Sequence, residues 1–116
     1  MAQPRPELRR GRIIWATVHA GNSVAKERPV IVLTATADIL PNDAFEAVAV
    51  TTTFSDPPPS DCIPLPWHPT GKTLTRLRRR SAAVLSWIDE VLPGDVISFG
   101  GDVPPQLMLE ILNRLT

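Results

Sequence analysis

The chain has 116 residues, of which 43% are apolar and 21% charged, and its 12 basic residues balance its 12 acidic ones. This length suits one domain with its own core, and the composition is that of a folded globular protein rather than a disordered one. Because the net charge is zero, overall charge attracts no polyanion, and any contact with nucleic acid needs a local basic surface.

The first part of the chain predicts an arm and three strands. Residues 1–10 contain two prolines and three arginines without an apolar run, and we expect a flexible arm there, ahead of a single domain over 11–116. β-Branched and aromatic residues predict strands over 11–18, 29–36 and 45–53. The proline-rich segment 56–61 cannot continue a ladder, because proline has no amide hydrogen to donate.

The second part predicts shorter strands and one helix. An edge strand is expected over 63–67, an exposed loop over 68–72, and two more strands over 81–87 and 96–99 with a turn between them. Pro104 and Pro105 suit the first turn of a helix, and apolar residues then recur at helical spacing up to Leu115. The pattern therefore indicates a mainly β fold, either a small β-barrel or a curled sheet, with a C-terminal helix.

Two features at neighbouring strand ends have the chemistry to hold a phosphodiester. Arg28 stands where a polar loop enters the apolar run 29–33, and the next apolar strand ends in the threonines 51–53. Arginine keeps its charge and binds phosphate through two donors at once, and successive threonines place hydroxyls on both faces of a strand. The simpler interpretation is a surface ion pair of Arg28 with Glu27 or Asp43, and threonines that merely face solvent.

A basic block and three tryptophans are further candidates for nucleic-acid contact. The block either tracks a phosphate backbone or forms a solvated loop. Trp15 and Trp87 lie inside predicted strands and are expected in the core, whereas Trp67, between prolines, is the better candidate for stacking on a base. The residues of the block are Lys72, Arg76, Arg78, Arg79 and Arg80.

Several classes of site find no support in the sequence. Cys62 is the only cysteine, so the chain forms no internal disulfide, and neither His19 nor His68 stands at metal-ligand spacing. The longest apolar runs are far shorter than a membrane span, and the first residues are unlike a secretory signal. We therefore expect a cytoplasmic protein with no metal and no cofactor.

The order of these features resembles the PemK/MazF family of toxin endoribonucleases from bacterial toxin–antitoxin systems. The resemblance covers about residues 11–115. The chain departs from the family pattern in the Lys26-Glu27 pair before Arg28, in Ala49, and in the proline-rich segment 56–61. The matching pieces are GRIIW at 11–15, RPVIVL at 28–33, VAVTT at 48–52, SAAV at 81–84 and VPP at 103–105.

The resemblance implies a fold, an activity and partners. The implied fold is the SH3-like small β-barrel with a terminal helix that PemK, MazF and CcdB toxins share. The implied activity is cleavage of single-stranded RNA by a homodimer without a metal, inhibited by a cognate antitoxin, with Arg28 and Thr51 as catalytic residues. The residues expected to bind RNA are Thr52, Lys72, Arg76, Arg78 and Arg79.

Two other functions remain open at this stage. A small barrel that binds nucleic acid without catalysis would use the basic block and have no need of Thr51. A CcdB-like inhibitor of DNA gyrase would share the barrel but not the pair of Arg28 and Thr51, so the presence of both residues argues against that function.

Overall fold

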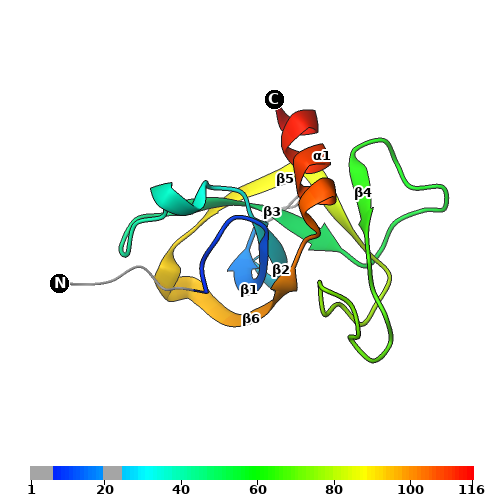
Figure 1. The fold of residues 1–116 in the computed structure, drawn as a ribbon, viewed down its shortest axis with the longest axis horizontal. Helices are drawn as coiled ribbons and strands as arrows, with labels where there is room; N and C mark the ends of the chain where they lie inside the picture. The colour runs from blue at the N-terminus through cyan, green and yellow to red at the C-terminus, as the bar shows by residue number, and fades with distance from the viewer. Residues whose placement is uncertain (1–6, 20–24) are drawn as a thin grey trace.

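The computed structural model describes residues 7–19 and 25–116, and in this part the chain forms one sheet and one helix. Figure 1 shows the helix standing against the curved sheet. The strands are β1 (Arg12–Val18), β2 (Lys26–Val32), β3 (Phe45–Thr51), β4 (Cys62–Leu65), β5 (Ser81–Val91) and β6 (Val96–Asp102), followed by helix α1 (Pro105–Leu115) and accompanied by 3-10 turns at Thr36–Asp38 and Pro93–Asp95.

The six strands form an antiparallel sheet in the order β4-β5-β3-β2-β1-β6. The predicted mainly β fold with a C-terminal helix is confirmed. The two edge strands of the described chain, β4 and β6, do not pair with each other, so the ladder is a curled sheet and not a closed barrel. Strands β1 and β2 lie between β5 and β6 in Figure 1, as this order requires.

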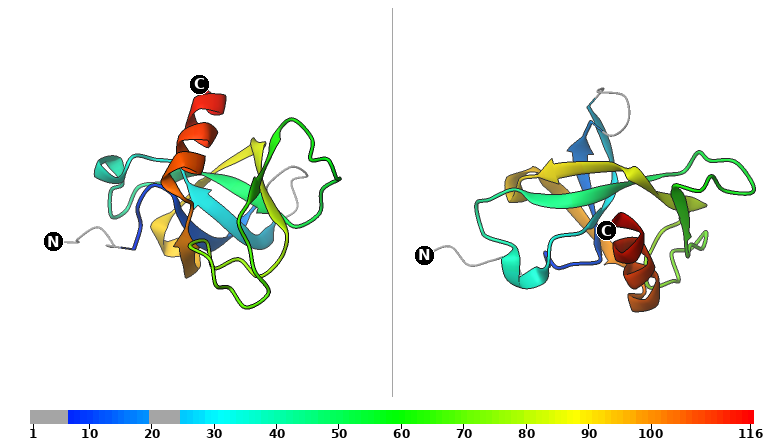
Figure 2. Two further views of the ribbon diagram at one scale, coloured as in Figure 1. Left: turned by 45° about the vertical axis from the view of Figure 1, so that its right-hand side comes forward. Right: turned by 90° about the horizontal axis from the view of Figure 1, so that it is seen from above.

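Apolar residues on both faces of the central strands are buried, and they alternate between two clusters. Ile14, Ala16 and Val30 belong to the cluster on the concave face, together with Phe45. The residues between them, such as Ile31, belong to a second cluster that Met108 and Ile111 of α1 complete. Figure 2 shows α1 lying along this side of the sheet. The continuous apolar runs in the sequence therefore reflect strands that are covered on both sides.

A loop covers the outer edge of β6 in place of a seventh strand. The amides of Gly101 and Asp102 donate to the carbonyls of Thr75 and Leu74 at 3.1 and 2.9 Å. The loop backbone approaches so closely that a Cβ on Gly101 would lie 2.0 Å from the Leu74 carbonyl oxygen. Only glycine fits this position, and the segment between β4 and β5 is thereby fixed to the other end of the sheet.

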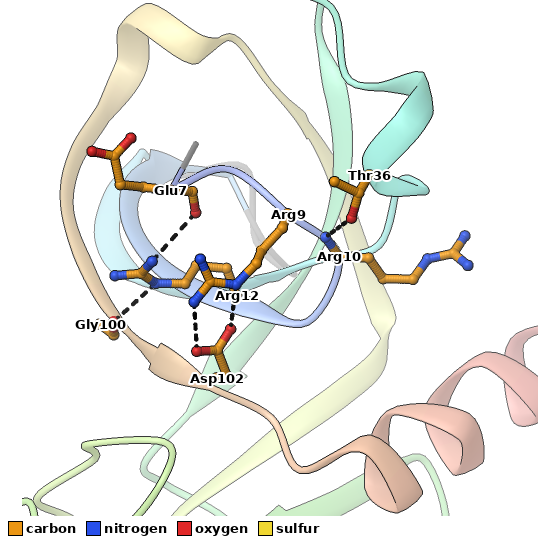
Figure 3. Close-up of polar contacts among 7 residues, drawn as sticks. All are labelled: Glu7, Arg9, Arg10, Arg12, Thr36, Gly100 and Asp102. Carbon is orange, nitrogen blue, oxygen red and sulfur yellow. Dashed lines mark hydrogen bonds and ion pairs between the residues drawn. The ribbon is translucent and has the colours of Figure 1, made fainter. Parts of the chain in front are cut away.

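The last residues of the predicted arm contact the sheet (Figure 3). Leu8 is buried in the concave-face cluster, and the Arg9 guanidinium donates to both carboxylate oxygens of Asp102 at 3.1 and 2.8 Å, which raises the pKa of Arg9. Arg12 donates from Nε to the Gly100 carbonyl at 3.0 Å, and its burial lowers its pKa. Residues 1–6 of the predicted arm lie outside the described residues.

The predicted strand over 29–36 needs correction, whereas the helix is placed correctly. Strand β2 begins at Lys26 and ends at Val32, because its first half pairs with β1 from Val18 opposite Lys26 onward. Arg28 is therefore the third residue of a strand and not the last residue of a loop. None of the helices in the described chain is long and apolar enough to cross a membrane.

Candidate active site

The register of the sheet brings Arg28 and Thr51 opposite each other. Val30 of β2 pairs with Ala49 of β3, and two residues further in the same register Arg28 faces Thr51. Backbone pairing between the two strands stops at Val30, so the strands diverge just where these residues stand. Both residues line a pocket of about 630 Å³ that opens between the separating strand ends.

Arg28 and Thr51 also share one face of the sheet. Side chains alternate along a strand, so Arg28 lies on the face of Val30 and Thr51 on the face of Ala49, and both of these neighbours belong to the concave-face cluster. Thr52, the first residue after β3, lines the same pocket. The two side chains that the sequence places at adjacent strand ends thus lie on one face, across from each other in the register.

The Arg28 guanidinium is held by an aromatic ring and not by an acid. It lies 5.1 Å from the centroid of the Trp87 ring, a cation–π contact. Among the described residues it forms no ion pair with Glu27 or Asp43, and its buried Nε has no hydrogen-bond partner. A buried donor without an acceptor costs about 1–3 kcal/mol, and a bound anion removes that cost by accepting from the guanidinium.

Among the residues that the structure describes, the Thr51 hydroxyl is engaged only by its own turn. Its oxygen accepts a hydrogen bond from the Thr53 amide at 3.1 Å and donates to the Thr53 carbonyl at 3.3 Å. This donor bond is long for a hydroxyl, whose usual oxygen–oxygen distance is about 2.7–2.8 Å. The acceptor bond fixes the orientation of the oxygen, while the proton is free to move to a better acceptor in the pocket.

Cations outnumber acids around the pocket. Lys26, Arg28 and Arg79 line it together with a single acid, Glu27, which the sequence analysis did not assign to the site. The local surface is therefore positive although the chain as a whole is neutral. The only signal in the sequence that could have placed Glu27 at this site is that it directly precedes Arg28, because a lone exposed glutamate has no other distinguishing feature.

The basic block divides into three parts. Arg79 lines the pocket of Arg28 and also a smaller adjoining hollow of about 280 Å³, which Arg76 and Arg78 line as well. Lys72 is exposed but lines neither of these spaces. Arg80 points elsewhere, since its guanidinium lies 3.7 Å from the centroid of the Phe54 ring and donates to the Phe54 carbonyl.

Two buried residues, Thr75 and Leu77, position the arginines of the block. The sequence analysis did not single them out. Thr75 is 1% exposed, and its hydroxyl donates to the Pro66 carbonyl at 2.6 Å and accepts from the Leu77 amide at 3.2 Å. Leu77 is buried as well, in the cluster beneath α1. Because Thr75 and Leu77 point inward, Arg76 and Arg78 are exposed. The alternation of Thr75, Arg76, Leu77 and Arg78 was the available signal.

Trp15 was expected to lie in the core, and this expectation is wrong. This residue is 39% exposed and lines both hollows, because the cluster that α1 packs includes Ile13 but ends before Trp15. Trp87 packs against the core as expected, and its ring also forms a wall of the pocket. Trp67 is 42% exposed, as expected, but it lies in a separate hollow with Pro58 and lines neither of the two described above.

Metal ligands do not gather in the described part of the chain. Residues 7–19 and 25–116 contain no group of three or more histidine, cysteine, aspartate or glutamate side chains that could hold an ion. The pocket itself offers fixed donors, since a guanidinium and a hydroxyl line one space with a second arginine beside them. Such an arrangement binds and polarises an anion, and a phosphodiester fits it.

Comparison with solved structures defines the class of fold. MazF (Form-I) from Deinococcus radiodurans matches with a TM-score of 0.72 and 16% identity, over 96% of this chain and 94% of that one. An endoribonuclease from a mycobacterial species matches with a TM-score of 0.68 and 15% identity, over 94% and 88%. A mycobacterial endoribonuclease in complex with its cognate antitoxin matches with a TM-score of 0.62 and 12% identity, over 96% and 90%.

These matches span nearly the whole chain, and the protein therefore has the fold of MazF toxins. The resemblance stated from the sequence is confirmed at the level of structure. At the level of sequence, no protein-family model and no curated protein matches the chain. The fold is thus established by structure alone.

Proposed function

We propose that this protein is the toxin of a toxin–antitoxin pair and a metal-independent endoribonuclease that cleaves single-stranded RNA. The observation that carries the proposal is the convergence of Arg28 and Thr51 on one pocket, where no acid neutralises the guanidinium. The MazF-like fold supports the same function, since structures of that fold include endoribonucleases.

The proposed reaction is an internal transfer at phosphorus. The ribose 2′-oxygen attacks the adjacent phosphorus, a new oxygen–phosphorus bond forms, and the bond to the 5′-oxygen of the next nucleotide breaks. The 2′-hydroxyl loses its proton and the departing 5′-oxygen gains one, which leaves a 2′,3′-cyclic phosphate and a 5′-hydroxyl. Arg28 and the Thr51 hydroxyl donate hydrogen bonds to the phosphoryl oxygens, where negative charge develops in the transition state.

Arg28 serves better as a charge stabiliser than as a base. A guanidinium keeps its proton at any physiological pH, so it cannot accept the proton of the 2′-hydroxyl without a large shift of its pKa. The cation–π contact with Trp87 holds the group in place and leaves its outer donors for the substrate. The Thr51 oxygen is likewise oriented before substrate arrives, so little reorganisation is needed during the reaction.

The decisive experiment compares four variants on a long single-stranded RNA in EDTA. Arg28→Ala and Thr51→Ala should each lower the cleavage rate by roughly 10²–10³, because each removes one donor to the developing charge. Arg114→Ala and Thr116→Ala, at the exposed end of α1, are the controls and should cleave like the parent protein. Circular dichroism verifies that every variant keeps the parent fold.

The same experiment separates the rival functions. Cleavage by the parent protein that ends in cyclic phosphate and survives either active-site substitution would show that the pair is assigned wrongly. Binding of RNA without cleavage would favour a non-catalytic nucleic-acid-binding module. If RNA is neither bound nor cut, inhibition of DNA supercoiling by gyrase should be measured, because that activity needs neither residue.

The proposal also assigns a partner. A cognate antitoxin with an acidic, extended segment would compete with RNA for the cations at Arg28 and Arg79, since one positive groove holds one polyanionic chain at a time. Structures of the same fold include a mycobacterial endoribonuclease bound to its cognate antitoxin. Displacement of labelled RNA by the antitoxin's C-terminal peptide tests this assignment, and simultaneous binding of both would contradict it.

A further inference from the structure

The hollow beside the pocket is continuous with it. Trp15, Pro29, Thr52 and Arg79 line both spaces, so the smaller hollow of about 280 Å³ shares four residues with the larger one of about 630 Å³. The two spaces differ in chemistry. The larger holds the convergent donors of Arg28 and Thr51, whereas the smaller has a mostly apolar wall that includes Ile13 and Leu77.

Trp15 forms the boundary between the two spaces. It pairs with Pro29 on one side and with Ser98 on the other, and neither of these compact residues covers an indole ring. Its strand neighbours Ile14 and Ala16 are both 0% exposed, but Trp15 is 39% exposed. A large aromatic side chain left open inside a hollow is the usual platform for a flat ring, because burial of its face is favourable once a ligand covers it.

We propose that the smaller hollow is a nucleobase subsite, in which the base next to the bound phosphate stacks on the Trp15 indole. This inference rests on the proposed function, since it places the phosphate at Arg28 and Thr51. Thr52 and Arg79 line both spaces and hold the sugar–phosphate that connects them. The volume lies just below the usual range for small-molecule sites, and it therefore admits one flat ring rather than a whole nucleotide.

The two spaces would contact different parts of the RNA. The larger pocket contacts the backbone, and its contribution weakens with added salt because exposed charges are screened. The smaller hollow contacts a base through its π-face, which every base possesses, so stacking on Trp15 adds affinity without selecting a sequence. Any preference among bases then comes from the polar rim of the hollow, where Arg76, Arg78 and the Thr52 hydroxyl stand.

The test uses two uncleavable probes, a short single-stranded DNA and an abasic oligomer with the same number of phosphates. Trp15→Leu should bind the DNA roughly 5- to 150-fold more weakly than the parent protein, the range that loss of one base–aromatic stack produces. Its affinity for the abasic oligomer should be unchanged. Trp15→Phe should retain most of the affinity for DNA. Trp67→Leu is the matched control, with 42% exposure against 39%, and should bind both probes like the parent.

Each result bears on the inference separately from the proposed function. If the parent protein cleaves RNA and Trp15→Leu binds DNA as tightly as the parent, the subsite is wrong and the proposed function is unaffected. A loss of affinity in Trp67→Leu instead would move the stacking site to the hollow of Pro58. If the parent binds neither RNA nor DNA, both proposals fail together.

A measurement on the unmodified protein covers the case in which Trp15→Leu does not fold. Single-stranded RNA that carries 5-iodouracil is irradiated with the parent protein, and the cross-linked peptide is identified by mass spectrometry. A base that stacks on Trp15 should give a cross-link within β1. Cross-links confined to the peptide of Trp67 would overturn the assignment.

Discussion

At the scale of single residues, the arginines of this protein differ in what neutralises them. Arg9 is paired with Asp102, and Arg80 is bound by the backbone carbonyls of residues 54 and 55. Arg28 has only a ring beside it, and the Arg79 side chain has no partner among the described residues. The three cations that line the larger pocket, Lys26, Arg28 and Arg79, form no ion pair with an acid among the described residues, so they are available to a ligand.

Arg80 is predicted to stabilise the turn after Thr51 and not to bind RNA. It donates to the Phe54 and Ser55 carbonyls at 2.9 and 3.1 Å and stacks on the Phe54 ring. Arg80→Ala should lower the free energy of unfolding by about 1–3 kcal/mol, because two charged hydrogen bonds and a cation–π contact are lost. Urea denaturation measures this change.

The neighbouring Arg79 supplies the matched control for this prediction. Arg79→Ala should change stability by less than about 0.5 kcal/mol, as expected for an exposed side chain without partners. The same substitution should weaken RNA binding, because Arg79 lines both hollows. An exchange of the two phenotypes, with Arg79 needed for stability and Arg80 for RNA, would contradict the assignment of both residues.

At the scale of elements, the sequence predicts most strands but misses where β2 begins. Proline at position 29 and the polar residues before it indicate a loop, since proline interrupts a ladder. In the structure β3 pairs with β2 only from Val30 onward. Residues 26–29 therefore have no β3 partner, and the missing amide hydrogen of Pro29 interrupts no hydrogen bond on that side of the strand. Local propensity therefore gave the wrong boundary, because pairing with β1 extends the strand through Lys26.

The candidate site was predictable in its residues but not in its shape. Arg28 and Thr51 could be proposed because Arg28 directly precedes one apolar run and Thr51 directly follows another. The exposure of Trp15 could not be predicted. It depends on which part of the sheet α1 covers, and α1 lies about 90 residues further along the chain. The alternation around Thr75 could indicate that this residue points inward, but the attachment of its loop to β6 could not be predicted, because it depends on the distant Gly101.

Gly101 is predicted to be essential for attachment of this loop to β6. In Gly101→Ala the new methyl group would meet the Leu74 carbonyl oxygen at 2.0 Å, so the loop or the strand has to move. We expect a loss of about 1–3 kcal/mol in the free energy of unfolding and faster amide exchange at Asp102, whose bond to Leu74 is broken.

Gly94→Ala is the control, because a Cβ at that position meets nothing within 4 Å. This variant should unfold at about the same denaturant concentration as the parent protein. Equal stability of the two glycine variants would mean that the loop yields easily, and that the close approach to β6 has little energetic weight.

At the scale of the whole molecule, exposed apolar residues predict a homodimer. Leu74 and Leu109 are 55% and 60% exposed, and both line a mostly apolar hollow of about 590 Å³ between α1 and the end of β6. Large apolar side chains that gather on one surface commonly mark an interface. Light scattering at micromolar concentration should give twice the 12.7 kDa of one chain.

A charge placed on this surface tests whether it is the interface. Leu109→Glu should give the mass of a monomer, because an unpaired carboxylate cannot be buried there without a large cost. Leu40→Glu is the matched control, since Leu40 is 52% exposed and lies outside that hollow. A parent protein with the mass of one chain would refute the dimer, and a dimer that survives Leu109→Glu would place the interface elsewhere.

The pairing of β1 with β6 has a consequence for synthesis on the ribosome. Chains fold as they emerge, N-terminal segments first, but Trp15 is flanked by Ser98, and the wall of its hollow includes Gly100. One edge of β1 can pair with β2 at once, but its other edge has no partner until β6 is made, and the hollow beside Arg28 and Thr51 is incomplete until residue 100 has left the exit tunnel. Under the proposed function, an unfinished chain would therefore lack the base subsite although β2 and β3, which hold Arg28 and Thr51, are already made.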